Sequence, residues 1–326
     1  MRIVRHHTYG PPGVLRSEEA PPPVCGPGDV LVRSEAIGVD HADVQRRRGA
    51  FPLGAPPLPH CPSADVCGTV VEVGTGVDTV TPGTRVTVWN APNAYAEYVA
   101  APAARVVAVP DGLDTAEATV LGATGRVAVN LLHTARLAPG ETVLVHSGAG
   151  AIGHLAVQAA RLLGAGRVLA TAGSPPKLDF ARSLGADAAV DYTASDWPER
   201  VAEAAGGDGV DVILDGVGGK QLVTDIALLA PFGRLVCFGG SGGDTQQPDI
   251  PVLDLLGMRQ ITGFSMPVFV KGRPDLARRT VSDLLRWLTE GTLRPVIHAR
   301  VPLDEAARAH ELLEERRASG RVVLVP

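Results

Sequence analysis

The spacing of hydrophobic positions along the chain changes near residue 115. Before it, short apolar runs separated by Gly and Pro clusters predict β-strands at 30–32 with 36–39, at 66–73, at 85–89 and at 95–99. After it, short β-branched runs alternate with stretches in which apolar residues recur every three or four positions. This alternation predicts β–α–β units, and therefore a parallel sheet with helices on both faces.

The second pattern begins with a helical stretch at 115–136. The strands that it then predicts are 142–146, 167–171, 188–191, 210–215, 233–238 and, as a last one, 258–264. The helices between them are 151–163, 176–184, 196–204 and 219–229. The C-terminal part predicts a long helix at 274–290, a strand at 296–301, a helix at 303–317 and a final strand at 321–325.

Residues 141–171 are the centre of this arrangement. The strand at 142–146 leads into a G-x-G-x-x-G motif and then into a helix; the motif is Gly148-Ala149-Gly150-Ala151-Ile152-Gly153. Gly148 would permit the tight turn, Gly150 the approach of a pyrophosphate to bare backbone, and Gly153 close packing of helix on strand. The strand–turn–helix context predicts a dinucleotide site; a glycine-rich turn that binds nothing is the alternative.

The end of the next strand bears on the choice of cofactor. NAD-binding folds place a carboxylate about 20 residues after the glycine motif, where it binds the ribose hydroxyls. Here the strand is followed by Gly173-Ser174-Pro175-Pro176-Lys177, which offers a hydroxyl and a cation. Both groups attract a 2′-phosphate, so Ser174 and Lys177 predict NADPH as the cofactor. The alternatives are Ser174 as a helix cap and Lys177 as a surface residue.

Three more turns follow strands at the edge of the sheet where ligands bind in such folds. Tyr192 comes after the third strand and could reach the adenosine phosphate, or be a partly buried surface aromatic. Small residues form the turns 215–219 and 237–240, which follow the fourth and fifth strands. From these two turns we expect three residues to flank the nicotinamide: Val217, Phe238 and Gly239.

The composition is that of a soluble globular protein with room for two domains. The chain has 326 residues, of which 45% are hydrophobic and 20% charged. Its net charge of −5 argues against nucleic acid or an anionic membrane as the main partner. It has no apolar run of about 18 residues and no apolar signal core, so we expect a cytoplasmic protein whose four cysteines need no disulfide. The excess of Arg over Lys is typical of a GC-rich bacterial genome.

The whole chain resembles the zinc-independent quinone oxidoreductases, the zeta-crystallin-like group of the medium-chain dehydrogenase/reductase superfamily. The resemblance rests on the glycine motif and on segments 38–43, 68–74, 95–99, 137–146, 184–187, 209–212 and 320–326. It implies an α/β protein with a GroES-like, mostly-β catalytic domain (1–118 and 266–326) and a Rossmann domain with a doubly wound parallel sheet (119–265). It also implies a homodimer and hydride transfer from NADPH to a quinone or an α,β-unsaturated carbonyl.

The resemblance also allows the question of a metal to be asked position by position. Zinc-dependent members of the superfamily place Cys, His and Cys or Asp around a catalytic zinc, and the aligned residues here are Asp40, Ala64 and Leu121. Alanine and leucine cannot ligate a metal, and the four-cysteine structural lobe is also absent from the sequence. Residues His41, Asp43, His60, Cys61, Asp65 and Cys67 show no recognised ligand spacing, so no metal is expected.

The part of the chain that would meet the substrate departs from the family pattern. The resemblance aligns Asp40 with a usual Asn, Gln45 with a common Tyr, and Arg126 with the Thr beside the nicotinamide. As catalytic candidates, Arg126 would polarise a carbonyl, Asp40 would position substrate, and Gln45 would hydrogen-bond substrate without acting as an acid. The alternative for Arg126 is a structural pair with Asp40 or Asp43.

Two other functions remain open. One is an enoyl-thioester reductase, for which Arg46-Arg47-Arg48 would dock a phosphopantetheine or other phosphorylated partner; three arginines are more often a solvated charged loop. The other is a non-catalytic NADPH-binding protein, a redox sensor or crystallin-like protein.

Overall fold

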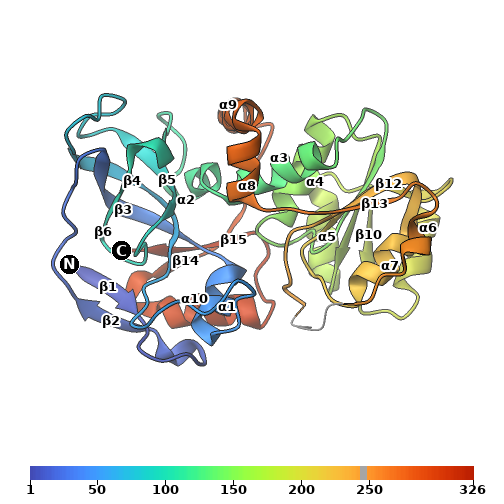
Figure 1. Ribbon diagram of the computed structural model, residues 1–326, viewed down its shortest axis with the longest axis horizontal. Helices are drawn as coiled ribbons and strands as arrows, with labels where there is room; N and C mark the ends of the chain where they lie inside the picture. Colours follow the sequence, from blue (N-terminus) through green and yellow to red (C-terminus); the bar gives the residue numbers. More distant parts are fainter. Residues whose placement is uncertain (243–247) are drawn as a thin grey trace. The chain divides into compact units, whose positions relative to one another are not determined.

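The computed structural model describes residues 1–242 and 248–326, and Figure 1 shows its elements. Residues 1–124 with 284–326 form one compact unit, here unit 1, and residues 125–283 form unit 2. The domain boundaries expected at 118/119 and 265/266 stay a prediction, because compactness alone does not define a domain. Within the described residues, no helix combines the length and apolar character needed to cross a membrane.

Unit 2 is built on a six-stranded parallel sheet. Its strands are β8 (Thr142–Val145), β9 (Arg167–Ala172), β10 (Ala188–Asp191), β11 (Val210–Asp215), β12 (Leu229–Cys237) and β13 (Gln260–Gly263). They lie in the order β10-β9-β8-β11-β12-β13, and every neighbouring pair is parallel. The strand order reverses between β8 and β11, the switch point at which doubly wound sheets bind ligands. The predicted doubly wound sheet is confirmed.

Four helices connect the first five strands where the hydrophobic spacing predicts them (Figure 1): α4 (Gly153–Leu162), α5 (Pro175–Ser183), α6 (Trp197–Ala205) and α7 (Gln221–Leu228). Helix α3 (Thr124–Thr134) precedes β8, and the predicted long helix α9 (Pro274–Glu290) follows β13. The short η4 (Val252–Leu255) and α8 (Met266–Gly272) are not predicted by the spacing. Helix α7 begins at Gln221, later than expected, because Gly218 and Gly219 have φ values of 71° and 64° that end the preceding turn.

The continuous helix expected over 115–136 is wrong. The chain forms α2 (Thr115–Ala118) and η3 (Thr119–Leu121), breaks at Gly122, and resumes as α3. A Cβ atom at Gly122 would lie 2.3 Å from Cγ of Asp65. The break is therefore imposed by a buried side chain from another strand, which the local pattern does not reveal.

Unit 1 is a mixed sheet of seven strands. They are β3 (Asp29–Val39), β4 (Ala64–Val73), β5 (Arg85–Ala91), β6 (Tyr98–Pro102), β7 (Val106–Ala108), β14 (Ile297–Pro302) and β15 (Arg321–Val325). The order is β14-β15-β3-β4-β5-β7, with β6 paired to β3, and a hairpin of β1 (Arg2–Arg5) and β2 (Arg16–Glu19) stands apart. Strand β15 runs antiparallel to β3, so the C-terminal segment returns to the N-terminal sheet as expected.

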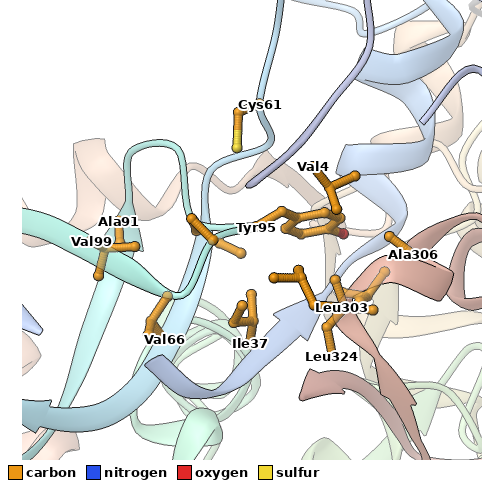
Figure 2. Packing of buried hydrophobic residues seen from close by; sticks show 14 of the residues in the cluster. Val4, Ile37, Cys61, Val66, Ala91, Tyr95, Val99, Leu303, Ala306 and Leu324 are labelled. Carbon is orange, nitrogen blue, oxygen red and sulfur yellow. The ribbon is translucent and has the colours of Figure 1, made fainter. Parts of the chain in front are cut away.

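The core of unit 1 gathers side chains from both ends of the chain. Figure 2 shows Val4, Ile37 and Val66 near Leu303 and Leu324, with the Tyr95 ring among them. The strand expected at 95–99 is shifted, because β6 starts only at Tyr98. Tyr95 and Ala96 are nevertheless completely buried, so the apolar run marks core residues without marking a sheet ladder.

The helices of unit 1 include one that the hydrophobic pattern does not predict. Helix α1 (His41–Arg48) follows β3, and α10 (Ala306–Glu314) covers most of the helix expected at 303–317, after the short turn η5 (Leu303–Glu305). Two other short turns are η1 (Pro12–Val14) and η2 (Ala103–Arg105). In α1 the buried side chains are Asp43, Val44 and Arg47, so two of three are charged.

Candidate functional site

The glycine motif forms the turn from β8 into α4, and its three glycines meet different surroundings. A Cβ atom at Gly148 would lie 2.6 Å from Cβ of Ala170, and one at Gly153 only 2.1 Å from the carbonyl oxygen of Ser147. At Gly150 the nearest atom would be 3.2 Å away, again the Ser147 oxygen. Gly148 and Gly153 are therefore fixed by packing, whereas Gly150 leaves the most open approach to the backbone.

The left-handed residue of this turn is Ser147, with φ of 52°, and not Gly148. Gly148 donates its N–H to the Thr171 carbonyl at 2.9 Å, which ties the turn to β9. The role expected for Gly148 is thus corrected from conformational freedom to close packing on β9. Between the glycines, Ala149 is buried, and Ala151 and Ile152 are partly exposed where α4 begins.

Beneath the turn lies a buried polar cluster that sequence reasoning missed. The His146 ring contacts Asp225 Oδ1 through Nε2 at 2.8 Å and Thr171 Oγ1 through Nδ1 at 2.9 Å. Burial disfavours the charged imidazole, but the charge and hydrogen bond of Asp225, with the charge of Asp215, together raise the pKa of His146. The cluster joins the strand end before the glycine turn to helix α7, so it stiffens the floor of the candidate cofactor site.

Ser174 and Lys177 lie at the start of α5, directly after β9. Ser174 is the N-cap residue, but within the described residues its side chain makes no capping hydrogen bond. The backbone carbonyl of Ser174 accepts the N–H of Lys177 at 3.0 Å instead. The cap alternative for the Ser174 hydroxyl is therefore not supported, and both side chains are partly exposed at the carboxyl end of the sheet.

Tyr192 approaches the same strand end from β10. Its backbone N–H donates to the Ala172 carbonyl at 3.2 Å, and a Cβ at Gly173 would lie 2.6 Å from the Tyr192 hydroxyl oxygen. The absence of a side chain at Gly173 thus makes room for the Tyr192 hydroxyl beside Ser174. The two predicted positions are brought together at one end of the sheet.

The turns after β11 and β12 are held by Asp215. Its carboxylate accepts N–H groups from Val217 at 2.6 Å and Gly218 at 3.0 Å. Its carbonyl accepts the N–H of Phe238 at 2.9 Å, and the Phe238 ring packs where a Cβ of Gly216 would be, at 2.8 Å. Val217, Phe238 and the exposed Gly239 therefore lie in neighbouring turns at the carboxyl ends of the strands, as expected.

In unit 1, a second polar cluster surrounds Asp40, the N-cap residue of α1. Oδ1 of Asp40 lies 3.3 Å from Nη1 of Arg321, and the buried Asp65 contacts Nη2 of the same guanidinium at 3.2 Å. Burial raises the pKa of Asp65 to about 6, against the opposing effect of Arg321. Sequence reasoning missed Arg321 because its partners are distant along the chain.

Asp43 lies one turn into α1 and is also buried. Oδ2 of Asp43 accepts the backbone N–H of Asp40 at 3.1 Å, and Oδ1 accepts from Arg46 Nη1 at 3.1 Å. Burial, followed by the charge of Asp40, raises the pKa of Asp43 to about 7. The half-buried Gln45 lies on the same helix.

Two family models match the chain, each over one of its parts. Residues 26–111 match the alcohol dehydrogenase GroES-like domain, and residues 151–290 match the zinc-binding dehydrogenase domain. A quinone oxidoreductase of Pseudomonas aeruginosa is 33% identical over 325 residues, which are 99% of either chain. The chain belongs to the quinone oxidoreductases of the medium-chain dehydrogenase/reductase superfamily. It is an oxidoreductase, with the GroES-like and Rossmann parts that the resemblance implies.

Two other proteins are similar to this chain over nearly its whole length. A 2-haloacrylate reductase of a Burkholderia species is 34% identical, covering 98% of this chain and 97% of its own. A mycobacterial protein solved in complex with NADPH is 35% identical, with a TM-score of 0.92 and complete coverage of both chains. Both are similar to this chain over its whole length.

A catalytic zinc does not fit the residues of this oxidoreductase. Of the aligned ligand positions, Ala64 and Leu121 have no donor atom, and the third, Asp40, is engaged by the Arg321 guanidinium. Across residues 1–242 and 248–326, no three His, Cys, Asp or Glu side chains are grouped so as to hold a metal.

Arg126, the remaining catalytic candidate, lies in the first turn of α3 and is only 7% exposed. The ion pairs found for Asp40 and Asp43 are with Arg321 and Arg46. A guanidinium has five N–H donors and stays charged, so Arg126 keeps the chemistry needed to polarise an oxygen. Its catalytic role, like those of Asp40 and Gln45, stays a prediction.

Proposed function

We propose that this oxidoreductase uses NADPH to reduce a quinone or an α,β-unsaturated carbonyl compound. The observation that carries the proposal is the end of β9, where Ser174 and Lys177 offer a hydroxyl and an ammonium in place of a carboxylate; within the described residues the hydroxyl makes no helix-capping hydrogen bond. A 2′-phosphate is attracted by that pair. The NADPH complex of the mycobacterial relative and the activities named for the Pseudomonas and Burkholderia relatives support the proposal.

The residues of unit 2 would bind the cofactor in three places. The bare backbone at Gly150 and the N-terminus of α4 favour the pyrophosphate, because helix N–H groups there lack partners and carry partial positive charge. Ser174, Lys177 and Tyr192 would bind the adenosine phosphate. Val217, Phe238 and Gly239 would flank the nicotinamide at the carboxyl ends of β11 and β12.

When bound, NADPH supplies a hydride for the β-carbon of the substrate. Charge then develops on the carbonyl oxygen, and a preorganised donor lowers the barrier by stabilising it. Arg126 is our choice for this donor. Gln45 would hydrogen-bond substrate, and Asp40 would position it.

Calorimetry with the two reduced nucleotides tests the cofactor assignment. We expect NADPH to bind at least tenfold more tightly than NADH, and Lys177→Ala to remove about 1.5–3 kcal/mol of that preference, as for a lost charged hydrogen bond. Lys271→Ala is a matched control, because Lys271 is an exposed lysine on α8. Equal affinities, or an unaltered preference in Lys177→Ala, would contradict the phosphate assignment.

An NADPH oxidation assay with quinones, enones and enoyl thioesters tests the reaction. Turnover of quinones or enones is expected; tight NADPH binding without any turnover would instead indicate a sensor or crystallin-like role. The docking role considered for Arg46-Arg47-Arg48 loses support, since Arg47 is completely buried and pairs with Glu314 and the Gly10 carbonyl. Enoyl thioesters are therefore expected to be poor substrates.

We further propose a homodimer that uses the edge strand β13. The segment that leads into this strand includes exposed apolar side chains: Val252, Leu253, Leu256 and Met258 are 62–78% exposed. An open strand edge with apolar surface next to it favours pairing with a second copy. Light scattering should give twice the chain mass, and Leu253→Asp with Leu256→Asp should give the monomer mass. A cytoplasmic location stays a prediction.

A further inference from the structure

Arg321 is a completely buried cation whose guanidinium binds partners from four segments. Nε donates to Thr119 Oγ1 at 2.9 Å, and Nη1 donates to Thr124 Oγ1 at 2.8 Å. The two carboxylates, Asp40 and Asp65, contact Nη1 at 3.3 Å and Nη2 at 3.2 Å. The planar guanidinium directs its N–H groups at fixed angles and so fixes the orientation of its partners, which the ammonium group of a lysine would not do.

Two glycines make the space for this cluster. A Cβ atom at Gly38 would lie 1.8 Å from Nη2 of Arg321, and one at Gly122 would lie 2.3 Å from Cγ of Asp65. Gly122 is also where the helical stretch 115–136 breaks. The backbone of two separate segments is thus shaped around one ion-pair cluster.

The two carboxylates in contact with Arg321 differ in their access to water. The Asp65 side chain is 2% exposed and also accepts backbone N–H groups from Asn90 at 3.2 Å and Ala123 at 2.7 Å. The Asp40 side chain is 29% exposed. The Asp65 oxygens are therefore occupied by hydrogen bonds within the protein, whereas the Asp40 carboxyl group can still accept a hydrogen bond from the solvent side.

Asp40 is the more exposed carboxyl group of the cluster. A guanidinium only donates hydrogen bonds, so the Asp40 oxygen that faces Arg321 is an acceptor. Asp43 and Asp65 are more deeply buried, which raises their pKa values to about 7 and about 6. Arg46 contacts Asp43, at 3.1 Å from Nη1 to Oδ1.

We propose that Arg321 is a positioning residue that holds the Asp40 side chain as a hydrogen-bond acceptor for substrate. The protein then selects reducible carbonyl compounds that carry a hydroxyl group near the carbonyl. An ionised carboxylate only accepts hydrogen bonds, so it binds a hydroxyl and leaves a bare carbonyl oxygen or a methyl ether without a donor. The Asn that the family resemblance aligns with Asp40 would both donate and accept through its amide. This inference rests on the proposed function for the placement of Asp40 beside substrate.

A matched pair of probes tests the selection. Hydroxycyclopentenone carries the hydrogen-bond donor, and in its O-methyl ether a methyl group replaces the hydroxyl hydrogen; the substitutions below separate the loss of the donor from the added size. Their dissociation constants are measured by calorimetry on the NADP⁺-loaded protein, and their kcat and KM with NADPH. We expect the hydroxyl compound to bind about tenfold more tightly than the ether, which is the scale of one hydrogen bond to a charged group.

Three substitutions assign the selection to this pair of residues. Asp40→Asn keeps the shape and removes the charge, and should reduce the preference to about twofold or less. Arg321→Lys keeps the charge but loses the fork, and should raise KM for the hydroxyl compound more than it lowers kcat. Asp65→Asn removes the other carboxylate on the same guanidinium and should retain the preference, which separates positioning of Asp40 from general damage to the fold.

The outcomes separate this inference from the proposed function. Preferential binding of the hydroxyl compound without turnover would support the role of Asp40 and contradict the reductase activity. Turnover with equal affinity for both probes, or an unchanged preference in Asp40→Asn, would overturn the inference and leave the reductase activity standing. Failure of both probes to bind at millimolar concentration would also overturn it.

Discussion

The hydroxyl oxygen of Tyr95 lies 3.0 Å from Nε2 of His310, although 215 residues separate the two along the chain. Nδ1 of His310 faces Nη1 of Arg47 at 3.5 Å. A guanidinium cannot accept a hydrogen bond, so Nδ1 is the acceptor and Nε2 carries the proton. His310 therefore donates to Tyr95, which in turn donates to Oδ2 of Asp43 at 3.4 Å. This series of hydrogen bonds, from His310 through Tyr95 to Asp43, connects α10 to α1.

The buried His310 should make unit 1 sensitive to acid. Burial, followed by the charge of Arg47, lowers the pKa of His310 to about 3. Between that value and about 6.5, the unfolded chain binds a proton that the folded protein does not, so stability falls as pH falls. Relative to His310→Gln, the wild type should lose up to about 1.4 kcal/mol of unfolding free energy per pH unit in this window.

Urea unfolding at several pH values between 4 and 7.5 checks the His310 prediction. Tyr95→Phe is the matched control, because it removes the hydroxyl from the same chain and burial raises the pKa of Tyr95 far above this range. Below pH 6, where Asp43 with its raised pKa of about 7 stays protonated, the cost of Tyr95→Phe should be constant with pH, at about 1–2 kcal/mol. If the difference in unfolding free energy between wild type and His310→Gln were equally constant with pH, the lowered pKa assigned to His310 would be contradicted.

Asp43 should have the opposite pH dependence. Burial and the charge of Asp40 raise the pKa of Asp43 to about 7, above the value of about 3.9 in an unfolded chain. The folded protein then binds the extra proton in this window, and the stability contributed by protonated Asp43 is lost as pH rises toward 7. Asp43→Asn, which resembles the protonated form, should gain stability relative to wild type as pH rises from 5 to 8.

The measurement for Asp43 is again the difference in unfolding free energy between variant and wild type. The titration of Asp65, with its raised pKa of about 6, is present in both proteins and cancels in the difference. A difference that stays flat, or that turns against Asp43→Asn as pH rises, would show that Asp43 is ionised throughout. The constant part of the difference reports the altered hydrogen bonds to Arg46 and Tyr95.

The parallel sheet of unit 2 is predictable from sequence because its signals are local. Each strand is a short buried apolar run, and each helix shows a regular apolar period, so the order of elements follows without long-range information. Helix α1 is different: its buried side chains include the charged Asp43 and Arg47, which leave no apolar period to detect. It is held by partners on other elements, such as Glu314 of α10.

The same reasoning explains which parts of the candidate site could be predicted. The glycine turn, Ser174 and Lys177 form a continuous local motif around β8 and β9. The Arg321 cluster joins residues as far apart as Asp40 and Arg321, which are 281 positions distant in sequence. A Gly at position 38 or 122 gives no sign of the side chain that it accommodates, so this site is visible only once the chain has folded.

The glycines of the turn should separate folding from cofactor binding. Gly153→Ala would place a Cβ 2.1 Å from the Ser147 oxygen, and we expect a loss of at least about 1–3 kcal/mol of stability, as for overpacking against backbone. Gly150→Ala meets its nearest atom at 3.2 Å, and φ of Gly150 is not left-handed. It should fold with stability within about 1 kcal/mol of wild type.

Cofactor titration completes the comparison of the two glycines. In Gly150→Ala the added methyl group occupies the approach to the backbone, so NADPH affinity should fall at least tenfold although the protein is folded. Thermal unfolding and NADPH fluorescence titration on the same samples give both quantities. Unchanged NADPH affinity in a folded Gly150→Ala variant would place the pyrophosphate elsewhere.

The pair of His146 and Asp225 should be the most costly ion pair to break in unit 2. Both side chains are completely enclosed, at 1% and 0% exposure, and Oδ2 of Asp225 has no hydrogen-bond partner among the described residues. The raised pKa of His146 favours its charged form, and Asp225→Asn would remove the counter-charge of that form, which costs about 3–5 kcal/mol for buried pairs. Asp179→Asn makes the same chemical change in an exposed pair with Arg182 and should cost less than about 1 kcal/mol. Urea unfolding of both variants at pH 7 measures this difference in cost.

The same two variants should differ in NADPH binding. Because His146 immediately precedes the glycine turn, Asp225→Asn should weaken NADPH binding, whereas Asp179→Asn should leave it unchanged. Similar small losses in the two variants would mean that His146 is neutral in the folded protein and that the floor of the turn does not depend on charge.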